Sequence, residues 1–187
     1  MSSNPTKEFL VDSDLVLFRH PRFSDWRNMM EKANSLTEEK SFGASQQIHT
    51  AEQHMQRMTE RLNAIENNIA VYLVVEIRGI VVGSACIWKT SDKPDEGWLE
   101  ISIRSTIPKT RKKLRGKGIG TKLTLAILHE AKTVLMVKIV KLGVYAVNHR
   151  ALQIYRKCGF TETSRVRREK NHFGTMRDRI YMQKCLR

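Results

Sequence analysis

The sequence has little of the residues that would mark an irregular or cross-linked protein. Only 4 of its 187 residues are proline and 10 are glycine, which excludes a collagen-like chain. Cys86, Cys158 and Cys185 are the only cysteines, and an odd number in a chain of this length excludes a disulfide scaffold. We expect all three to be reduced thiols. A hydrophobic content of 41% with 28% charged residues is near the globular average, which excludes disorder over the whole chain.

Long hydrophobic runs are also missing. The longest, Ile69–Val75, ends at Glu76 and suits a buried strand, because a membrane span needs about 20 apolar residues. Residues 1–8 contain no apolar stretch of the signal-peptide type. We therefore expect one domain over residues 1–187, with a flexible, frayed start over residues 1–12, in the cytoplasm and without membrane contact.

Charge of one sign dominates. The chain has 33 Lys and Arg residues against 19 Asp and Glu residues, a formal net charge of +14. This excess predicts attraction to polyanions, either nucleic acid, a phosphorylated cofactor or acidic substrates. It does not choose among them, and solubility alone would also account for much of it.

Hydrophobic periodicity predicts an α/β fold with a mixed central sheet of about seven strands and about four helices. The expected order is strand 15–19, helices 26–35 and 48–67, strands 70–77, 80–88 and 98–104, helix 118–135, strand 137–147, helix 148–158, and strands 160–168 and 177–184.

A glycine-rich segment, Arg115–Gly120, lies between a predicted strand and the helix over residues 118–135. Glycines allow consecutive backbone N–H groups to point at one anion, and the helix N-terminus adds partial positive charge. The side chains of Arg115, Lys117 and Lys122 would add full charges. The segment lacks the Gly-Lys-Ser/Thr ending of a Walker loop, and its glycine spacing is not that of a dinucleotide fingerprint.

A second motif, Asn148–Phe160, follows the next predicted strand and reads Asn-x-x-Ala-x-x-x-Tyr-x-x-x-Gly-Phe. Together the two motifs resemble those of the GNAT superfamily of N-acetyltransferases. The ending Gly174–Met182 is similar to the last hairpin of prokaryotic members that act on small amines or protein N-termini. The resemblance is strong over residues 70–184 and vague before them.

The resemblance implies a GNAT-type domain whose strands splay at the binding site of acetyl-CoA, used as a co-substrate. We expect no metal, because His129-Glu130 lacks the second histidine of a zinc motif. The pyrophosphate would lie on the backbone N–H groups at the start of the helix, and the pantetheine arm would lie along the preceding strand. The residues implied in cofactor binding are Ile103, Arg104, Ser105, Arg115, Gly116, Lys117, Gly118, Ile119, Gly120, Thr121, Asn148 and Tyr155.

The resemblance also implies that Tyr155 stands by the thioester sulfur as the general acid. A carboxylate can accept the proton of the attacking amine, and Glu100 is the candidate, with Glu76 in reserve. Residues 104–114 are longer than the family's usual connection. The strand segment that touches the cofactor is therefore either 101–103 or 103–105, and we favour the second.

The acceptor amine belongs to an amino acid, a small metabolite or a protein N-terminus, and the sequence leaves these open. Homodimerisation also stays open. The basic run from Lys109 to Lys117 fits a solvated loop, a clamp on the 3′-phosphate of the cofactor, or contact with RNA or an acidic partner. The alternative function is a basic nucleic-acid-binding or ribosome-binding module that keeps the fold without catalysis.

Overall fold

The computed structural model describes residues 7–38, 50–108, 110–170 and 174–186, with side chains described up to residue 34 in the first range. In this part of the chain eight strands form one mixed sheet with the order β1-β2-β3-β4-β5-β6-β8-β7. The strands are β1 (Lys7–Val11), β2 (Asp14–Arg19), β3 (Ala70–Ile77), β4 (Ile80–Thr90), β5 (Lys93–Ile103), β6 (Ile139–Tyr145), β7 (Thr161–Lys170) and β8 (Met176–Cys185). The four α-helices are α1 (Trp26–Glu38), α2 (Ala51–Glu66), α3 (Ile119–Thr133) and α4 (His149–Lys157), and a short 3-10 helix η1 (Phe23–Asp25) precedes α1.

The strand β1 is a correction to the expected frayed start over residues 1–12. It pairs antiparallel with β2 from Lys7 opposite Phe18 to Val11 opposite Asp14, and Phe9 packs edge-on against Phe18 at 5.2 Å between ring centroids. It raises the strand number from the expected seven to eight. The pairing comes from a tight turn in which Asp12 and Ser13 both have positive φ, and residues 1–6 lie outside the described residues.

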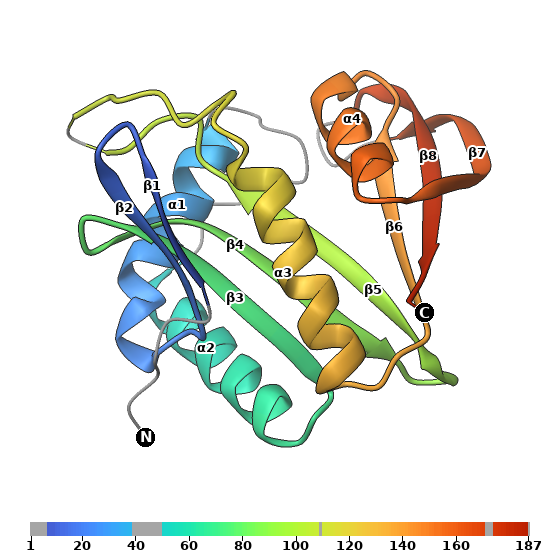
Figure 1. Cartoon of the computed structure of the whole chain (residues 1–187), viewed down its shortest axis with the longest axis horizontal. Coiled ribbons are helices and arrows are strands. Elements are labelled where there is room, and N and C mark those ends of the chain that lie inside the picture. The colour runs from blue at the N-terminus through green and yellow to red at the C-terminus, as the bar shows by residue number, and fades with distance from the viewer. Residues whose placement is uncertain (1–6, 39–49, 109, 171–173, 187) are drawn as a thin grey trace.

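Helices cover both faces of the sheet (Figure 1). On one face α3 buries Leu123, Ile127 and Ala131 completely, as its predicted apolar face requires. The helix was expected to reach residue 135 but ends at Thr133, and Val134 beyond it is 48% exposed. The opposite face is covered by α1 and α2, whose Met29 and Met58 are buried there.

The parallel pair β5–β6 joins two parts of the sheet that are otherwise antiparallel. Its register contains three residue pairs, from Glu96 opposite Ile139 to Trp98 opposite Lys141. Beyond them the two strands diverge, and β6 continues with α4, β7 and β8 as a separate group of elements (Figure 1). The sheet thus stays continuous at one end of β5 and opens at the other.

Candidate active site

The divergence of β5 and β6 leaves the second half of β5 without a neighbour on one side. From Leu99 to Ile103 the strand pairs with β4 but has no partner in β6. Its backbone N–H and C=O groups on that side are therefore available to an extended ligand, which could add to the sheet like another strand. Of the two segments expected to contact the cofactor, 101–103 lies wholly within this unpaired stretch. The segment that we favoured, 103–105, has only its first residue on β5, because the strand ends before Arg104 and Ser105.

The start of α3 lies at the same end of the sheet as this open edge (Figure 1). Gly118 is the N-cap residue of α3 with φ +74°, and Gly116 has φ +80°. Both conformations favour glycine, and a Cβ at either position would meet no atom within 4 Å. Gly116 and Gly118 thus leave open space at the start of α3, whose first N–H groups have no acceptor within the helix, as an anion cradle requires.

Gly120 differs from these two glycines because its surroundings are packed. A Cβ there would lie 2.9 Å from Cδ1 of Ile154 and 3.8 Å from Cδ1 of Ile103. The absent side chain therefore lets α3, α4 and the end of β5 meet. Ile119 is buried at 2% exposure and belongs to the core, and the Thr121 carbonyl faces the Cys158 thiol at 3.8 Å. Any contact of Ile119 with an anion must come from its backbone.

The basic residues near the cradle are less free than the sequence suggests. Nζ of Lys117 forms an ion pair with Asp12 at 2.7 Å, and Nζ of Lys122 lies 3.8 Å from the centroid of the Phe9 ring. Both partners come from β1 and the turn that follows it. Of the three cations expected at the cradle, only Arg115 has no interaction in the described part of the chain.

The described part of residues 104–114 forms an excursion that folds back onto the main core, although Arg111 and Lys113 stay exposed. Ile107 and Leu114 are buried in the main core at 1% and 5% exposure, and the backbone bridge between Thr106 and Lys113 closes the excursion. Lys112 donates from Nζ to Asp14 at 2.7 Å, so the solvated reading is wrong for this residue. Lys109 lies outside the described residues.

Asp14 ties this excursion to the first strands. Its carboxylate, 5% exposed, accepts from Lys112 at 2.7 Å and from Nε of Arg78 at 2.6 Å. The hydrogen bond from Lys112, followed by that from Arg78, holds the pKa of Asp14 below its ordinary value. The β1–β2 hairpin thereby fixes the connection that leads from β5 to the cradle.

The helix α4 carries the two residues of the second motif. Oδ1 of Asn148 accepts from the N–H of Ala151 at 3.2 Å and caps the helix, which leaves its amide NH2 without a partner in the described residues. The ring of Tyr155 packs edge-on against Phe160, with centroids 5.8 Å apart. Burial, with a smaller contribution from Cys158, raises the pKa of Tyr155 to about 12, so its hydroxyl keeps its proton at neutral pH. Cys158 is 3% exposed and lies in the core.

Glu100 lies on the part of β5 that lacks a β6 partner, and its side chain is exposed. Its Oε2 lies 3.9 Å from the Cys86 thiol, the opposite residue on β4. Burial, and then the charge of Glu100, raise the pKa of Cys86 to about 12, which keeps that thiol protonated. The Glu100 carboxylate is thus accessible beside the open edge, on the face covered by α1 and α2.

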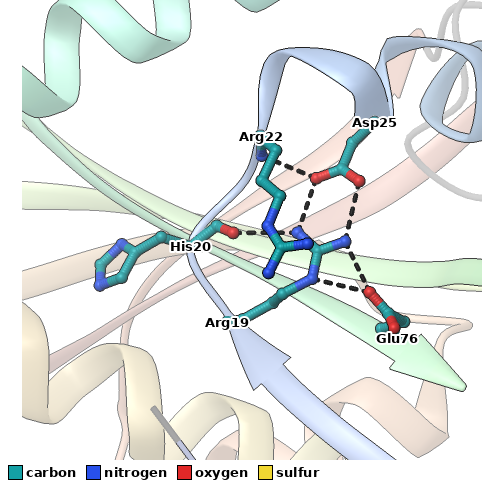
Figure 2. Close-up of polar contacts among 5 residues, drawn as sticks. All are labelled: Arg19, His20, Arg22, Asp25 and Glu76. Carbon is teal, nitrogen blue, oxygen red and sulfur yellow. Dashed lines mark hydrogen bonds and ion pairs between the residues drawn. The ribbon is translucent and has the colours of Figure 1, made fainter. Parts of the chain in front are cut away.

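Glu76, the reserve candidate, is engaged in an ion pair with Arg19. Its Oε2 accepts from Nε and Nη2 of Arg19 at 2.7 and 2.6 Å. The same guanidinium makes a bidentate pair with Asp25, from Nη1 and Nη2 at 2.7 and 2.8 Å. Figure 2 shows how Arg19 joins the two carboxylates, with Asp25 also accepting from the backbone N–H of Arg22 at 2.7 Å.

This buried network positions α1. Asp25 ends η1 directly before α1, and Arg19 ends β2, so their ion pair holds the start of the helix against the sheet. The hydrogen bonds that Arg19 donates to Asp25 raise the pKa of Arg19 despite its burial. Both side chains are almost fully buried, at 6% and 7% exposure, where loss of one partner is costly. The network therefore determines where the side chains of α1 meet β4.

One of those side chains, Lys32, is a candidate site residue that the sequence analysis missed. It is 4% exposed, and its Nζ donates to Oγ of Ser84 on β4 at 2.7 Å. Burial, together with the charges of Arg61 and Arg104, lowers the pKa of Lys32 to about 7. The spacing along the helix could have indicated this burial, because Lys32 lies three residues after the buried Met29 on the same face of α1.

These features define an α/β acetyltransferase. Its mixed sheet contains two parallel central strands, β5 and β6, that diverge beside α3, a helix with a glycine at its N-cap. The sequence profile of the acetyltransferase (GNAT) family matches residues 34–160, more than half of the chain, and the chain belongs to this family. Acetyl-CoA is accordingly its co-substrate. No match was found among curated protein sequences.

Solved structures of acetyltransferases share the fold. A ribosomal-protein-alanine N-acetyltransferase from Brucella melitensis has 24% sequence identity and a TM-score of 0.75, covering 91% of this chain and 99% of its own. The yncA protein of Salmonella typhimurium, solved with acetyl-CoA, has 19% identity and a TM-score of 0.77, with coverage of 92% and 94%. A spermidine N-acetyltransferase from Vibrio cholerae, solved with CoA and spermine, has 19% identity and a TM-score of 0.71, with coverage of 91% and 95%.

Two further observations concern metals and membranes. Among the described residues, no group of three or more His, Cys, Asp and Glu side chains is placed to hold a metal ion. No helix in the same residues is long and apolar enough to cross a membrane.

Proposed function

We propose that this acetyltransferase moves the acetyl group from acetyl-CoA directly to a primary amine that approaches from the face of the sheet covered by α1 and α2. The observation that carries the proposal is the open edge of β5 from Leu99 to Ile103, which lies at the same end of the sheet as the Gly118 cradle. An edge for an extended arm and a cradle for a phosphate are the two halves of a coenzyme A site.

The residues present fit this cofactor. The N–H groups of the first turn of α3 would hold the pyrophosphate, where the open space at Gly118 leaves room for it. The pantetheine arm would bond to the β5 edge in the register 101–103, because this segment lies within the part of β5 that β6 leaves unpaired. The amide of Asn148 has hydrogen atoms to donate to the arm.

Glu100 and Tyr155 would carry the proton transfers. The amine nitrogen forms a bond to the thioester carbonyl carbon, and the Glu100 carboxylate accepts the proton that the nitrogen releases, directly or through water. The C–S bond then breaks, and the Tyr155 hydroxyl donates to the sulfur as negative charge develops there. With a pKa of about 12 against about 8.5 for a free thiol, Tyr155 stabilises the thiolate chiefly as a hydrogen-bond donor.

Glu100→Gln tests the assignment of the base. Release of free thiol from acetyl-CoA is followed with a panel of amines at several pH values. We expect kcat to fall by about 10²-fold at pH 7 and to recover toward high pH, where the amine loses its own proton. Glu96→Gln is the control, because it changes the same side chain on β5 before the strands diverge, and its melting temperature is measured as well because Glu96 pairs with Lys141. An equal loss at every pH would rule out a base role for Glu100.

The acceptor class remains the amine of an amino acid, a small metabolite or a protein N-terminus. The structural neighbours include enzymes for ribosomal-protein alanine and for spermidine. These neighbours support an amine acceptor in general. The choice between an amino acid, a small metabolite and a protein N-terminus must be argued from the residues of this chain that face the acceptor.

A further inference from the structure

The face of the sheet covered by α1 and α2 contains buried positive charge. The ammonium of Lys32 donates to Ser84 at 2.7 Å, and no carboxylate lies within ion-pair distance of it among the described residues. An ammonium has three hydrogen atoms to donate, so two remain for another partner. Burying a cation without an anion costs free energy, and Lys32 loses part of its charge instead, with a pKa of about 7.

Arg61 on α2 adds a second cation to this face. Its guanidinium carbon lies 5.3 Å from the centroid of the Tyr72 ring, and its Nη1 is buried without a hydrogen-bond acceptor in the described residues. Arg61 and Arg104 both act on Lys32 electrostatically, and both lower its pKa. The charged and titratable neighbours of Lys32 are therefore two arginines and the protonated thiol of Cys86. This thiol faces Oε2 of Glu100 at 3.9 Å.

The spacing of this cluster relative to the proposed base follows from the strand register. Ser84 lies two residues before Cys86 on β4, so their side chains point to the same face about 7 Å apart. Cys86 is opposite Glu100 on β5. An anion-binding group and a proton acceptor thus lie on one face, separated by the length of a small molecule.

We propose that the acceptor is a small amine that carries an anionic group, a carboxylate or a phosphate, bound by Lys32, Ser84 and Arg61 while its amine faces Glu100. This proposal rests on the proposed function and names its acceptor class. The anion supplies the missing partner of Lys32 and restores its full charge. A polyamine has a cation at each end and would place one of them beside Lys32 and Arg61.

Matched acceptors test the proposal with the full chain and acetyl-CoA. α-Amino acids are compared with their carboxamides, and aminoethyl phosphate with ethanolamine, with spermidine as the polycation. We expect kcat/KM to be about 10–100-fold higher for the anionic member of one pair, the loss typical of one charged hydrogen bond. The favoured pair distinguishes carboxylate from phosphate. Equal rates within both pairs, or a preference for spermidine, would overturn the inference. Thiol release with none of the amines would contradict the proposed function itself.

Two variants separate recognition from a structural role. Lys32→Met keeps the length of the side chain without its charge, and Arg61→Gln keeps a polar group, while Arg57→Gln changes an exposed arginine on the same helix as the control. We expect the first two to raise KM for the anionic acceptor about 10–100-fold, with little change for its neutral partner. Equal losses for both members of the pair would overturn the assignment. Melting temperatures identify a variant that fails to fold. In that case the comparison of the two acceptor pairs with the wild-type chain tests the proposal.

Discussion

The hydroxyl of Tyr155 provides the sharpest prediction about chemistry. In Tyr155→Phe the ring keeps its edge-on contact with Phe160, at 5.8 Å between centroids. The hydroxyl makes no hydrogen bond in the described part of the chain, so its removal breaks no fold contact. We therefore expect a melting temperature close to that of the wild type and a KM for acetyl-CoA within a few-fold.

The magnitude follows from the two pKa values. A phenol of pKa about 12 cannot transfer its proton fully to a thiolate of pKa about 8.5, which is already a good leaving group. What is lost is one hydrogen bond to developing charge, so kcat should fall by about 10²-fold, equivalent to about 2.7 kcal/mol. Because Tyr155 stays protonated, kcat of the wild type should show no loss from its ionisation between pH 6 and pH 10.

The assay is steady-state thiol release, with Tyr181→Phe as the control. That variant removes a hydroxyl from β8, where we assign no contact with reacting atoms. An unchanged kcat in Tyr155→Phe would refute the acid role and leave water to protonate the thiolate. A large fall in melting temperature would show that the hydroxyl serves the fold instead.

Three further predictions concern the charges around the site. The pKa of Lys32 is lowered from 10.5 to about 7 in the folded chain, so the unfolded chain binds more protons between these two pH values. The free energy of unfolding should therefore rise with pH in this window, by about 1 kcal/mol per pH unit. Below pH 7 Lys32 should contribute no pH dependence. Lys32→Met should abolish this rise in pH-dependent denaturation and stabilise the chain at pH 7, and a slope that persists would contradict the burial of the charge. In the basic excursion, Lys112→Ala should lower the melting temperature because it removes a partner of Asp14. The double variant Arg111→Ala and Lys113→Ala should instead raise KM for acetyl-CoA more than for a dephospho donor, and equal effects on both donors would refute a role in binding the 3′-phosphate.

Local patterns predicted the elements that carry the two motifs. Gly118 opens α3 and Asn148 caps α4, as their glycine and capping chemistry requires. In α2, Met58 is buried and Leu62 and Ile65 pack beside it, at the i, i+4 and i+7 spacing of a helical apolar face. In these cases the information lies within one helical turn of the residue concerned.

The parts that sequence reasoning missed depend on contacts between distant segments. Lys7–Val11 forms a strand only because β2 is available to pair with it. Lys112 forms an ion pair because the fold brings Asp14, which is 98 residues away in the sequence, within hydrogen-bond distance of it. Lys32 is buried because α1 crosses β4, and the Arg19–Asp25 ion pair holds the helix there. No local pattern in the sequence specifies such pairings.

Calorimetric titration of acetyl-CoA into the wild type and two glycine variants tests the central claim most directly. Gly118 and Gly79 have φ of +74° and +73°, and a Cβ at either would meet no atom within 4 Å, so alanine introduces the same backbone strain at both. Only Gly118 lies at the start of α3, while Gly79 lies in the turn between β3 and β4. We predict that Gly118→Ala weakens acetyl-CoA binding at least about 10-fold, which corresponds to about 1.4 kcal/mol, and that Gly79→Ala binds as the wild type does. Equal affinity in all three proteins would contradict the placement of the cofactor at this helix.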